Sequence, residues 1–396
     1  MPEQTEQIAV FNAGSSSLKF SIYQGESAIY QGLVDRLESS GSGASRAVIR
    51  GADRTSLFDG PIAAKNHDQA LEWLFNWLEQ PPHHVRPAAV GHRVVHGGDA
   101  FVAPTRVTSD VFDKLEALTP LAPLHQPHSL SPIRFLTRRF PELAQVACFD
   151  TAFHATQSRI ERMYALPREY FDRGIKRYGF HGLSYEFIAG RLPEVDTRAA
   201  AGRTIVCHLG NGASLCALRA GRSVATSMGF TPLDGIPMGT RCGSISPAVL
   251  LHLLGQEKMR VEELSDLLYH RSGLLGISGI SADMRDLLTS PAPSAAEAVE
   301  YFCYRIAQEI GSLAAVLGGL DAIVFTAGIG EHAARVRARV VELSHWLGAS
   351  IDAAANAADR SLLHAGTSAV KILVIPTNEE LMIDRHTRRV LAENKN

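Results

Sequence analysis

Two similar stretches decide the fold: Val10-Phe-Asn-Ala-Gly-Ser-Ser-Ser-Leu18 and Val206-Cys-His-Leu-Gly-Asn-Gly-Ala-Ser-Leu215, almost half the chain apart. Each predicts a strand, a polar turn containing glycine, the pair Ser-Leu and a second apolar strand, with one extra residue in the second turn. Short turns also resemble one another by chance, so duplication and coincidence both stay open on these residues alone. Duplication would give two similar domains, each presenting a β-hairpin turn to the cleft between them.

Outside the repeat, apolar runs typical of strands alternate with helical patterns. The expected strands are Ile8–Phe11, Ala88–Val95, Val146–Phe149, Ile205–His208, Ala322–Thr326 and Ile372–Ile375. The clearest expected helices are Asp68–Glu79, Val261–His270, Ala295–Leu317, Glu331–Leu347 and Asn378–Ala392. This alternation predicts an α/β architecture.

The composition is that of a globular protein. A length of 396 residues predicts two domains, and 39 Lys and Arg against 41 Asp and Glu leave no global charge to attract nucleic acid or a membrane surface. The longest apolar stretch, Leu313–Gly330, contains Asp321, Thr326 and several glycines, so it predicts a helix end, a turn and a strand. The polar start Met1–Gln7 and five scattered cysteines without C-x-x-C spacing indicate the cytoplasm.

Asn12–Lys19 is a candidate phosphate-binding turn. Gly and Ser let backbone N–H groups approach phosphate oxygens, and a lysine supplies charge. A purely structural hairpin would explain the same residues. The segment also contains the S-x-x-K pattern of penicillin-binding serine hydrolases, but the S-D-N and K-T-G partners of that pattern are missing from the sequence.

Gly91–Gly98 places two histidines and an arginine near the end of an expected strand. On a strand, His92 and His96 would stand about 13 Å apart at ~3.3 Å per residue, too far to share a metal ion. Arg93 is the stronger candidate, because a guanidinium is always charged and binds carboxylate or phosphate through two parallel hydrogen bonds. A surface ion pair is the alternative.

Further weak motifs are loops punctuated by glycine or proline. Residues 123–128 contain an H-x-x-H spacing, but the flanking prolines argue against zinc. Gly328–His332 follows an expected strand and opens a helix, an arrangement that lets backbone approach a nucleotide, although G-x-G is an incomplete Rossmann fingerprint. Asn378 and Glu379 follow another strand, where helix capping is the alternative to a functional role.

Taken together, these motifs resemble the acetate kinase family in order and spacing over essentially the whole chain. The matching segments are 10–20, 91–98, 122–127, 149–154, 178–184, 208–214, 231–243, 283–285, 328–332 and 376–380. The resemblance implies two duplicated domains of the actin, Hsp70 and sugar kinase (ribonuclease H-like) fold, an active cleft between them and a homodimer. It places residues 1–152 and 385–396 in the first domain and 153–384 in the second, nucleotide-binding domain.

The implied activity is reversible, direct in-line transfer of the γ-phosphoryl group of ATP to acetate, giving acetyl phosphate and ADP, with Mg²⁺ or alternatively Mn²⁺. The resemblance assigns catalysis to Arg93, Asp150, His181 and Arg241, with Arg93 also holding the substrate carboxylate. It assigns the acetate methyl pocket to Val95, Leu124, Phe180 and Pro232, and the metal to Asn12 and Glu379. It assigns the nucleotide to Lys19, His208, Leu209, Gly210, Asn211, Gly212, Asp283, Met284, Arg285, Gly328, Ile329, Gly330, Glu331 and His332.

Position 332 is His where some family members carry Asn, so one adenosine contact differs. Two alternatives stay open: a propionate or butyrate kinase of the same superfamily, and an ATP-driven binding protein of the Hsp70 or actin type. The loops around Arg93 and His181 favour an enzyme with an acceptor site over a chaperone.

Overall fold

The computed structural model describes residues 6–14, 16–37 and 44–393, so Ser15 of the expected phosphate turn lies outside the described residues. The chain divides into two compact units. Unit 1 comprises the chain up to Ala152 together with the segment from Asn378 onward, and unit 2 is Phe153–Thr377. Within the described residues, no helix has the length and apolar character needed to cross a membrane.

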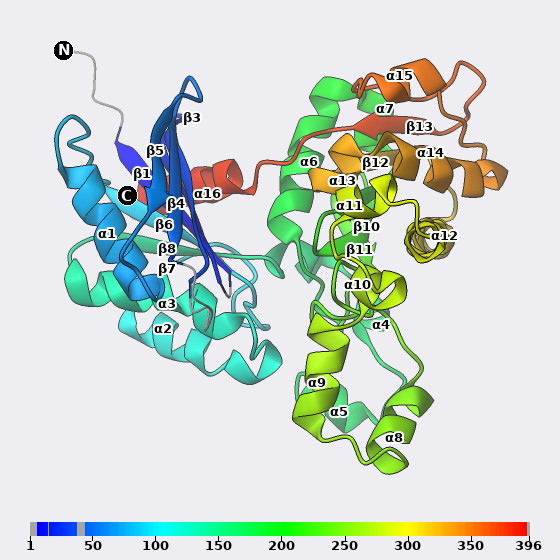
Figure 1. Ribbon diagram of the computed structural model, residues 1–396, viewed down its shortest axis with the longest axis horizontal. Coiled ribbons are helices and arrows are strands. Elements are labelled where there is room, and N and C mark those ends of the chain that lie inside the picture. The colour runs from blue at the N-terminus through cyan, green and yellow to red at the C-terminus, as the bar shows by residue number, and fades with distance from the viewer. Residues whose placement is uncertain (1–5, 15, 38–43, 394–396) are drawn as a thin grey trace. The chain divides into compact units, whose positions relative to one another are not determined.

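Unit 1 is built on one large sheet covered by helices (Figure 1). Its strands are β1 (Gln7–Ala13), β2 (Leu18–Gln24), β3 (Ser27–Asp35), β4 (Arg46–Gly51), β5 (Ser56–Pro61), β6 (Ala89–Val94), β7 (Thr105–Arg106) and β8 (Ala144–Phe149). Its helices are α1 (His67–Glu79), α2 (Ser109–Glu116), α3 (Gln126–Arg139) and α16 (Glu379–Glu393), with the 3-10 turns η1 (Thr119–Leu121) and η2 (Ala152–Thr156), the latter starting at the boundary.

Unit 2 carries a smaller sheet and more helices. Its strands are β9 (Arg203–Leu209), β10 (Ala213–Arg219), β11 (Arg222–Thr226), β12 (Ala322–Thr326) and β13 (Lys371–Val374). Its helices are α4 (Arg159–Arg162), α5 (Arg168–Asp172), α6 (Gly182–Val195), α7 (Thr197–Ala201), α8 (Pro247–Gly255), α9 (Val261–His270), α10 (Gly273–Ser278), α11 (Met284–Thr289), α12 (Pro293–Leu317), α13 (Ala327–His332), α14 (Ala334–Leu343) and α15 (Ala353–Ala357), with the 3-10 turn η3 (His345–Leu347).

The sheet topology confirms the duplication. Within the described chain the larger sheet has the order β5-β4-β3-β2-β1-β6-β8-β7 and the smaller one β11-β10-β9-β12-β13. Both contain a run of three antiparallel strands followed by two parallel ones, β3-β2-β1-β6-β8 in the larger sheet and β11-β10-β9-β12-β13 in the smaller. The larger sheet adds antiparallel strands β4 and β5 at one edge and β7 at the other. The two repeated stretches form the equivalent hairpins β1–β2 and β9–β10.

Helix α16 completes the core of unit 1 although it is far away in sequence. Figure 1 draws it in red beside the blue strands of that unit, and it contacts β1, β6 and β8. A Cβ atom on Gly91 of β6 would lie 2.3 Å from Thr387 Oγ1 and 2.5 Å from Ile383 Cγ2, so only glycine permits this close approach. Because α16 packs as one helix, the chain returns to unit 1 at Asn378, earlier than the expected 385.

The helix boundaries follow local chemistry in most places. The Asn378 side chain caps α16 by accepting a hydrogen bond of 3.0 Å from Leu381 N, as expected. Helix α12 ends at Gly318, which adopts a left-handed φ of +70°.

The single helix expected over Glu331–Leu347 is wrong, because the chain breaks at Ala333 between α13 and α14. The buried guanidinium of Arg337 donates to the carbonyl oxygens of Gly330 (3.0 Å) and Glu331 (2.7 Å) and so terminates α13.

Candidate active site

Arg93 lies at the carboxyl end of β6 and is held by a carboxylate on the neighbouring strand end. Its Nε donates to Asp150 Oδ1 (2.9 Å) and its Nη2 to Asp150 Oδ2 (2.6 Å), while Nη1 donates to Asn12 Oδ1 (3.2 Å). The Arg93 side chain is 21% exposed and that of Asp150 only 2%. Two parallel charge-assisted hydrogen bonds of this kind fix the plane of the guanidinium.

Glu379, in the first turn of α16, adds a second carboxylate to this group. Its Oε2 lies 4.0 Å from Arg93 Nε. Burial raises the pKa of Glu379 to about 7, because desolvation, joined by Asp150 and Glu380, outweighs the attraction of Arg93 and Lys19. Burial alone would lower the pKa of Arg93, but its carboxylate neighbours raise it, so the arginine stays charged.

Asn12 and Glu379 are the two residues expected to bind magnesium. Within the part of the chain that the structure describes, no cluster of three or more His, Cys, Asp or Glu side chains could hold a metal ion. Mg²⁺ needs only one or two protein oxygens, because it keeps most of its water ligands. An amide oxygen and a largely enclosed carboxylate, whose side chain is 14% exposed and whose charged form a nearby cation would stabilise, fit such an ion.

Unit 2 contributes two stacked histidines, His181 and His208, with ring centroids 4.3 Å apart and planes 20° from parallel. His181 precedes α6 in a left-handed conformation, with φ 58° and ψ 23°, and its Nδ1 lies 2.8 Å from Ser214 Oγ. His208 lies in β9, and its Nδ1 is 2.8 Å from Ser184 Oγ. A hydroxyl group therefore fixes each imidazole ring.

The turn between β9 and β10 lies against His181 and Arg241. A Cβ atom on Gly212 would stand 3.4 Å from His181 Nε2 and 3.7 Å from Arg241 Nη1, so an imidazole nitrogen and a guanidinium converge on this turn. Arg241 is partly buried, and its Nη1 donates to the carbonyl oxygen of Pro232 (3.2 Å). Donors gathered around bare backbone suit an anionic oxygen.

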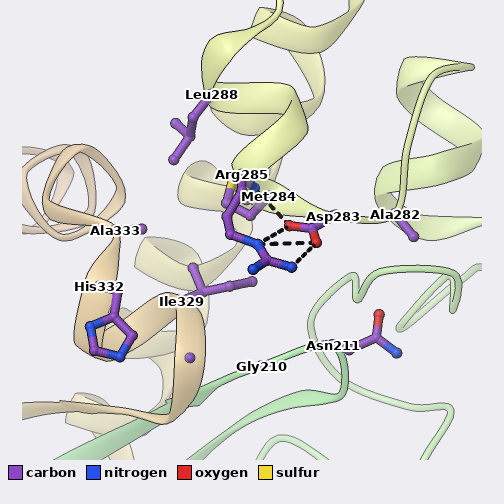
Figure 2. Close-up of a pocket in the computed structure, with 11 residues that line it drawn as sticks. Gly210, Asn211, Ala282, Asp283, Met284, Arg285, Leu288, Ile329, His332 and Ala333 are labelled. Atoms are coloured by element: carbon purple, nitrogen blue, oxygen red, sulfur yellow. Dashed lines mark hydrogen bonds and ion pairs between the residues drawn. The ribbon is translucent and has the colours of Figure 1, made fainter. Parts of the chain in front are cut away.

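A pocket of about 430 Å³ in unit 2 has the size of a small-molecule site. Figure 2 shows Ile329, Met284 and Leu288 contributing apolar atoms, with Arg285 turned toward Asp283. Arg285 Nη2 and Asp283 Oδ2 lie 2.5 Å apart. The lining residues are Gly210, Asn211, Ala282, Asp283, Met284, Arg285, Leu288, Gly328, Ile329, His332 and Ala333.

This pocket gathers most of the segments expected at the nucleotide. Other residues expected there are absent from its lining: Lys19 belongs to unit 1, and His208, Leu209, Gly212, Gly330 and Glu331 flank the lining residues in sequence. Glu331 instead accepts hydrogen bonds at Oε1 from Ala327 N (2.8 Å) and Thr377 N (3.3 Å). Sequence reasoning missed Leu288, although its spacing of four from Met284 on a short helix could have indicated a shared face.

The four residues expected around the acetate methyl divide between the units. Val95 and Leu124 belong to unit 1, and Phe180 and Pro232 to unit 2. Val95, Phe180 and Pro232 are buried, whereas Leu124 is 37% exposed.

Solved structures with this fold are found among kinases of small carboxylic acids. A propionate kinase from Francisella tularensis matches with a TM-score of 0.91 and 36% identity, covering 97% of this chain and 100% of that one. An acetate kinase from Porphyromonas gingivalis matches with a TM-score of 0.88 and 33% identity, covering 98% and 100%. The fold therefore places the chain in the structural class of the acetate and propionate kinases.

The sequence comparisons identify the family. The model of the acetokinase family matches residues 7–385. Similar curated proteins include an acetate kinase from Rhodopseudomonas palustris strain TIE-1, 50% identical over 98% of both chains. Another is an acetate kinase from Rhizobium meliloti, 46% identical over 98% of this chain and 99% of the relative. The chain belongs to the acetokinase family.

Proposed function

We propose that the chain is an acetate kinase, which transfers the γ-phosphoryl group of ATP to acetate and catalyses the reverse reaction from acetyl phosphate and ADP. Full-length relatives at 46–50% identity bear that name. The structural observation that carries the proposal is the Arg93–Asp150 fork. It presents one preoriented, permanently charged guanidinium at a strand end, which suits an acceptor carboxylate.

Transfer of a phosphoryl group requires little covalent chemistry from the protein. A loose transition state spreads negative charge over three equatorial oxygens, so positioning and electrostatic stabilisation do most of the catalysis. Arg93, Arg241 and His181 supply donors for the acetate carboxylate and the transferring group. The pocket lined by Met284 and Ile329 holds the nucleoside.

Asn12 and Glu379 are the residues that would hold Mg²⁺, with Mn²⁺ as an alternative. When bound, the ion neutralises charge on the nucleotide phosphates. Lys19 pairs with Asn12 across the β1–β2 hairpin and adds a second cation for the phosphates.

Asp150 acts on Arg93 and does not remove a proton from the substrate. Acetate is already ionised near neutral pH, so a general base has no proton to take. Both carboxylate oxygens of Asp150 accept hydrogen bonds from Arg93, which supports an orienting role.

A homodimer and a cytoplasmic location are part of the proposal. The apolar helix α8 has no buried residue within the chain, and Leu251 on it is 71% exposed. Such a surface suits a second copy of the chain.

A propionate kinase is the second candidate function, because the Francisella tularensis relative at a TM-score of 0.91 bears that name. An ATP-driven binding protein lacks comparable support. A coupled assay of ADP release with acetate, propionate, butyrate and no acceptor separates the three. We expect the largest kcat/KM with acetate. Equal or larger kcat/KM with propionate would replace the assignment, and acceptor-independent hydrolysis at the same rate would reject a kinase.

A further inference from the structure

A buried row of polar groups lies behind His181, on the side of the ring opposite Nε2. Ser214 in β10 and Tyr185 in α6 are both fully buried. Ser214 Oγ lies 2.8 Å from His181 Nδ1, and the Tyr185 hydroxyl is hydrogen-bonded to the same Ser214 oxygen. Tyr185 stands one helical turn after His181, so α6 and β10 together build a Tyr185–Ser214–His181 row.

The chemistry of the three groups gives this row a direction. Each hydroxyl has one proton to donate, and a phenol is both the stronger acid and the weaker acceptor when paired with an aliphatic alcohol. Tyr185 therefore donates to Ser214 Oγ, and the proton of Ser214 is left to donate to His181 Nδ1. In a neutral imidazole whose Nδ1 accepts, the proton must lie on Nε2.

The opposite end of the ring faces the turn between β9 and β10. His181 Nε2 is 3.4 Å from the point where a Cβ atom on Gly212 would stand, and Arg241 Nη1 is 3.7 Å from the same point. An N–H at Nε2 would thus add a donor beside the guanidinium. A ring with its proton on Nδ1 would instead present a lone pair there and repel an anionic oxygen.

The backbone of His181 supports the importance of this orientation. Its left-handed conformation is uncommon for a residue with a side chain and persists only where surrounding contacts impose it. The stacked His208 ring limits movement of the His181 ring on one face, and the hydrogen bond to the Ser214 hydroxyl fixes the orientation of that ring.

We propose that Tyr185 and Ser214 are positioning residues that fix His181 in the Nε2-protonated form, so that it donates a hydrogen bond to the transferring phosphoryl group. The inference rests on the proposed function through the role given to His181. Neither residue touches the reacting atoms, and both act through the imidazole.

Kinetics provide the first test. Ser214→Ala should lower kcat by roughly 10- to 100-fold, the usual scale for loss of a group that orients a functional histidine, with the KM values for ATP and acetate within about twofold of wild type. Tyr185→Phe should lower kcat less, by about 3- to 10-fold, because Ser214 can still donate. The double variant should be no slower than Ser214→Ala, since both changes act through one row.

Two further variants separate positioning from packing. Ser214→Thr keeps the hydroxyl and should restore most of kcat. Tyr178 is a buried tyrosine three residues before His181, and its hydroxyl donates to Gly174 O (3.0 Å). Tyr178→Phe removes this hydroxyl and should leave kcat unchanged. Equal losses in Tyr178→Phe and Tyr185→Phe, or wild-type kcat in Ser214→Ala, would overturn the proposal.

The tautomer can be measured without any turnover. Long-range ¹H–¹⁵N correlation spectra of the full chain labelled with ¹⁵N-histidine assign His181 by comparison with His181→Gln. We expect a protonated Nε2 in the wild type and a shift toward Nδ1 protonation in Ser214→Ala. Nδ1 protonation in the wild type would contradict the proposal that Ser214 donates to His181 Nδ1. If the tautomer is as expected but His181→Gln keeps full activity, then the Tyr185–Ser214–His181 row fixes the tautomer as proposed, but His181 has no catalytic role.

Discussion

The two units use one arrangement of five strands for different chemistry. Strands β3-β2-β1-β6-β8 of unit 1 correspond in order and direction to β11-β10-β9-β12-β13 of unit 2. Across the equivalent hairpins Asn12 pairs with Lys19, and His208 pairs with Ser214. One hairpin therefore carries an amide and a cation, whereas the other carries an imidazole and a hydroxyl.

The ends of the parallel strands differ in the same way. In unit 1 they present Arg93 and Asp150, and α16 adds Glu379. In unit 2 the chain passes from β12 directly into α13, whose Ile329 lines the apolar pocket. The shared sheet supplies strand ends, and under the proposed function the few residues placed there determine whether a unit binds a charged group or a nucleoside.

The largest expected effect tests the charged residues that the two units contribute. Arg93→Ala and Arg241→Ala should each lower kcat/KM for acetate by at least ~100-fold, the scale of one preorganised donor. Arg93→Lys should stay close to Arg93→Ala, because an ammonium cannot reproduce the fork onto Asp150. Steady-state kinetics with unchanged circular dichroism measure this. Near wild-type turnover in either alanine variant would make that arginine structural.

A smaller effect is expected when the support of Arg93 is weakened. Asp150→Asn replaces an acceptor with a side chain that can donate toward the guanidinium, so kcat should fall by roughly 10- to 100-fold. If Asp150 only orients Arg93, the apparent Mg²⁺ affinity will match that of the wild type. A weaker affinity with recovery at high Mg²⁺ would mean that Asp150 instead orders metal-bound water. Loss of a limb of the pH–rate profile near the carboxylate pKa would restore a general base.

A third comparison concerns strand residues at one register position. His92 in β6 and Phe325 in β12 face equivalent neighbours, Phe11 and Cys207. Burial lowers the pKa of His92 to about 3, and its Nδ1 has no hydrogen-bond partner among the described residues. In the unfolded chain His92 binds a proton near pH 6.5, whereas in the folded protein it stays neutral down to about pH 3. The contribution of neutral His92 to the unfolding free energy should therefore be fully present above pH 6.5 and be lost progressively as the pH falls toward 3.

His92→Phe copies unit 2 and should remove this pH dependence. When the pH is lowered from 7.5 to 5.5, the unfolding free energy of the wild type should fall by about 1.4 kcal/mol more than that of the variant. This is the value expected for one histidine that takes up a proton near pH 6.5 in the unfolded chain and stays neutral in the folded protein. Urea unfolding at both pH values measures this. His270→Gln, a change at an exposed histidine, should keep the wild-type difference. Identical pH dependence in wild type and His92→Phe would contradict the prediction.

The smallest effect concerns acyl size. Val95 is buried, and one methylene group in an apolar pocket is worth about 1–3 kcal/mol, so selectivity between acetate and propionate should be modest. Val95→Ala should raise kcat/KM for propionate relative to acetate by about 3- to 10-fold. Parallel assays with both acids give the ratio, and Val102→Ala, at a residue 53% exposed, is the matched control. An unchanged ratio would place the methyl pocket elsewhere.

Features written in local sequence were predictable. The hairpins followed from the repeated Gly and Ser turns, and the cap at Asn378 from an amide before an acidic first turn. The break at Ala333 was not predictable, because the helical periodicity continues through it. The side chain of Arg337, six to seven residues further along, folds back onto the carbonyl oxygens of Gly330 and Glu331 and ends α13. The fork between Arg93 and Asp150 joins residues far apart in sequence, so only the family resemblance placed both in one site.

The packing of α16 has a consequence for synthesis of the chain on the ribosome. Unit 2 is one continuous segment and has all its strands once Val374 has emerged, whereas Gly91 of unit 1 waits for Ile383 and Thr387. The strands synthesised first would then be the last to acquire a complete core, so unit 1 would be exposed to chaperones while it is incompletely folded. Chains that end at Thr377 and have been released from the ribosome should resist protease in unit 2 and be cut in unit 1. Protection of both units at that length would mean that the core of unit 1 forms before α16 packs against it.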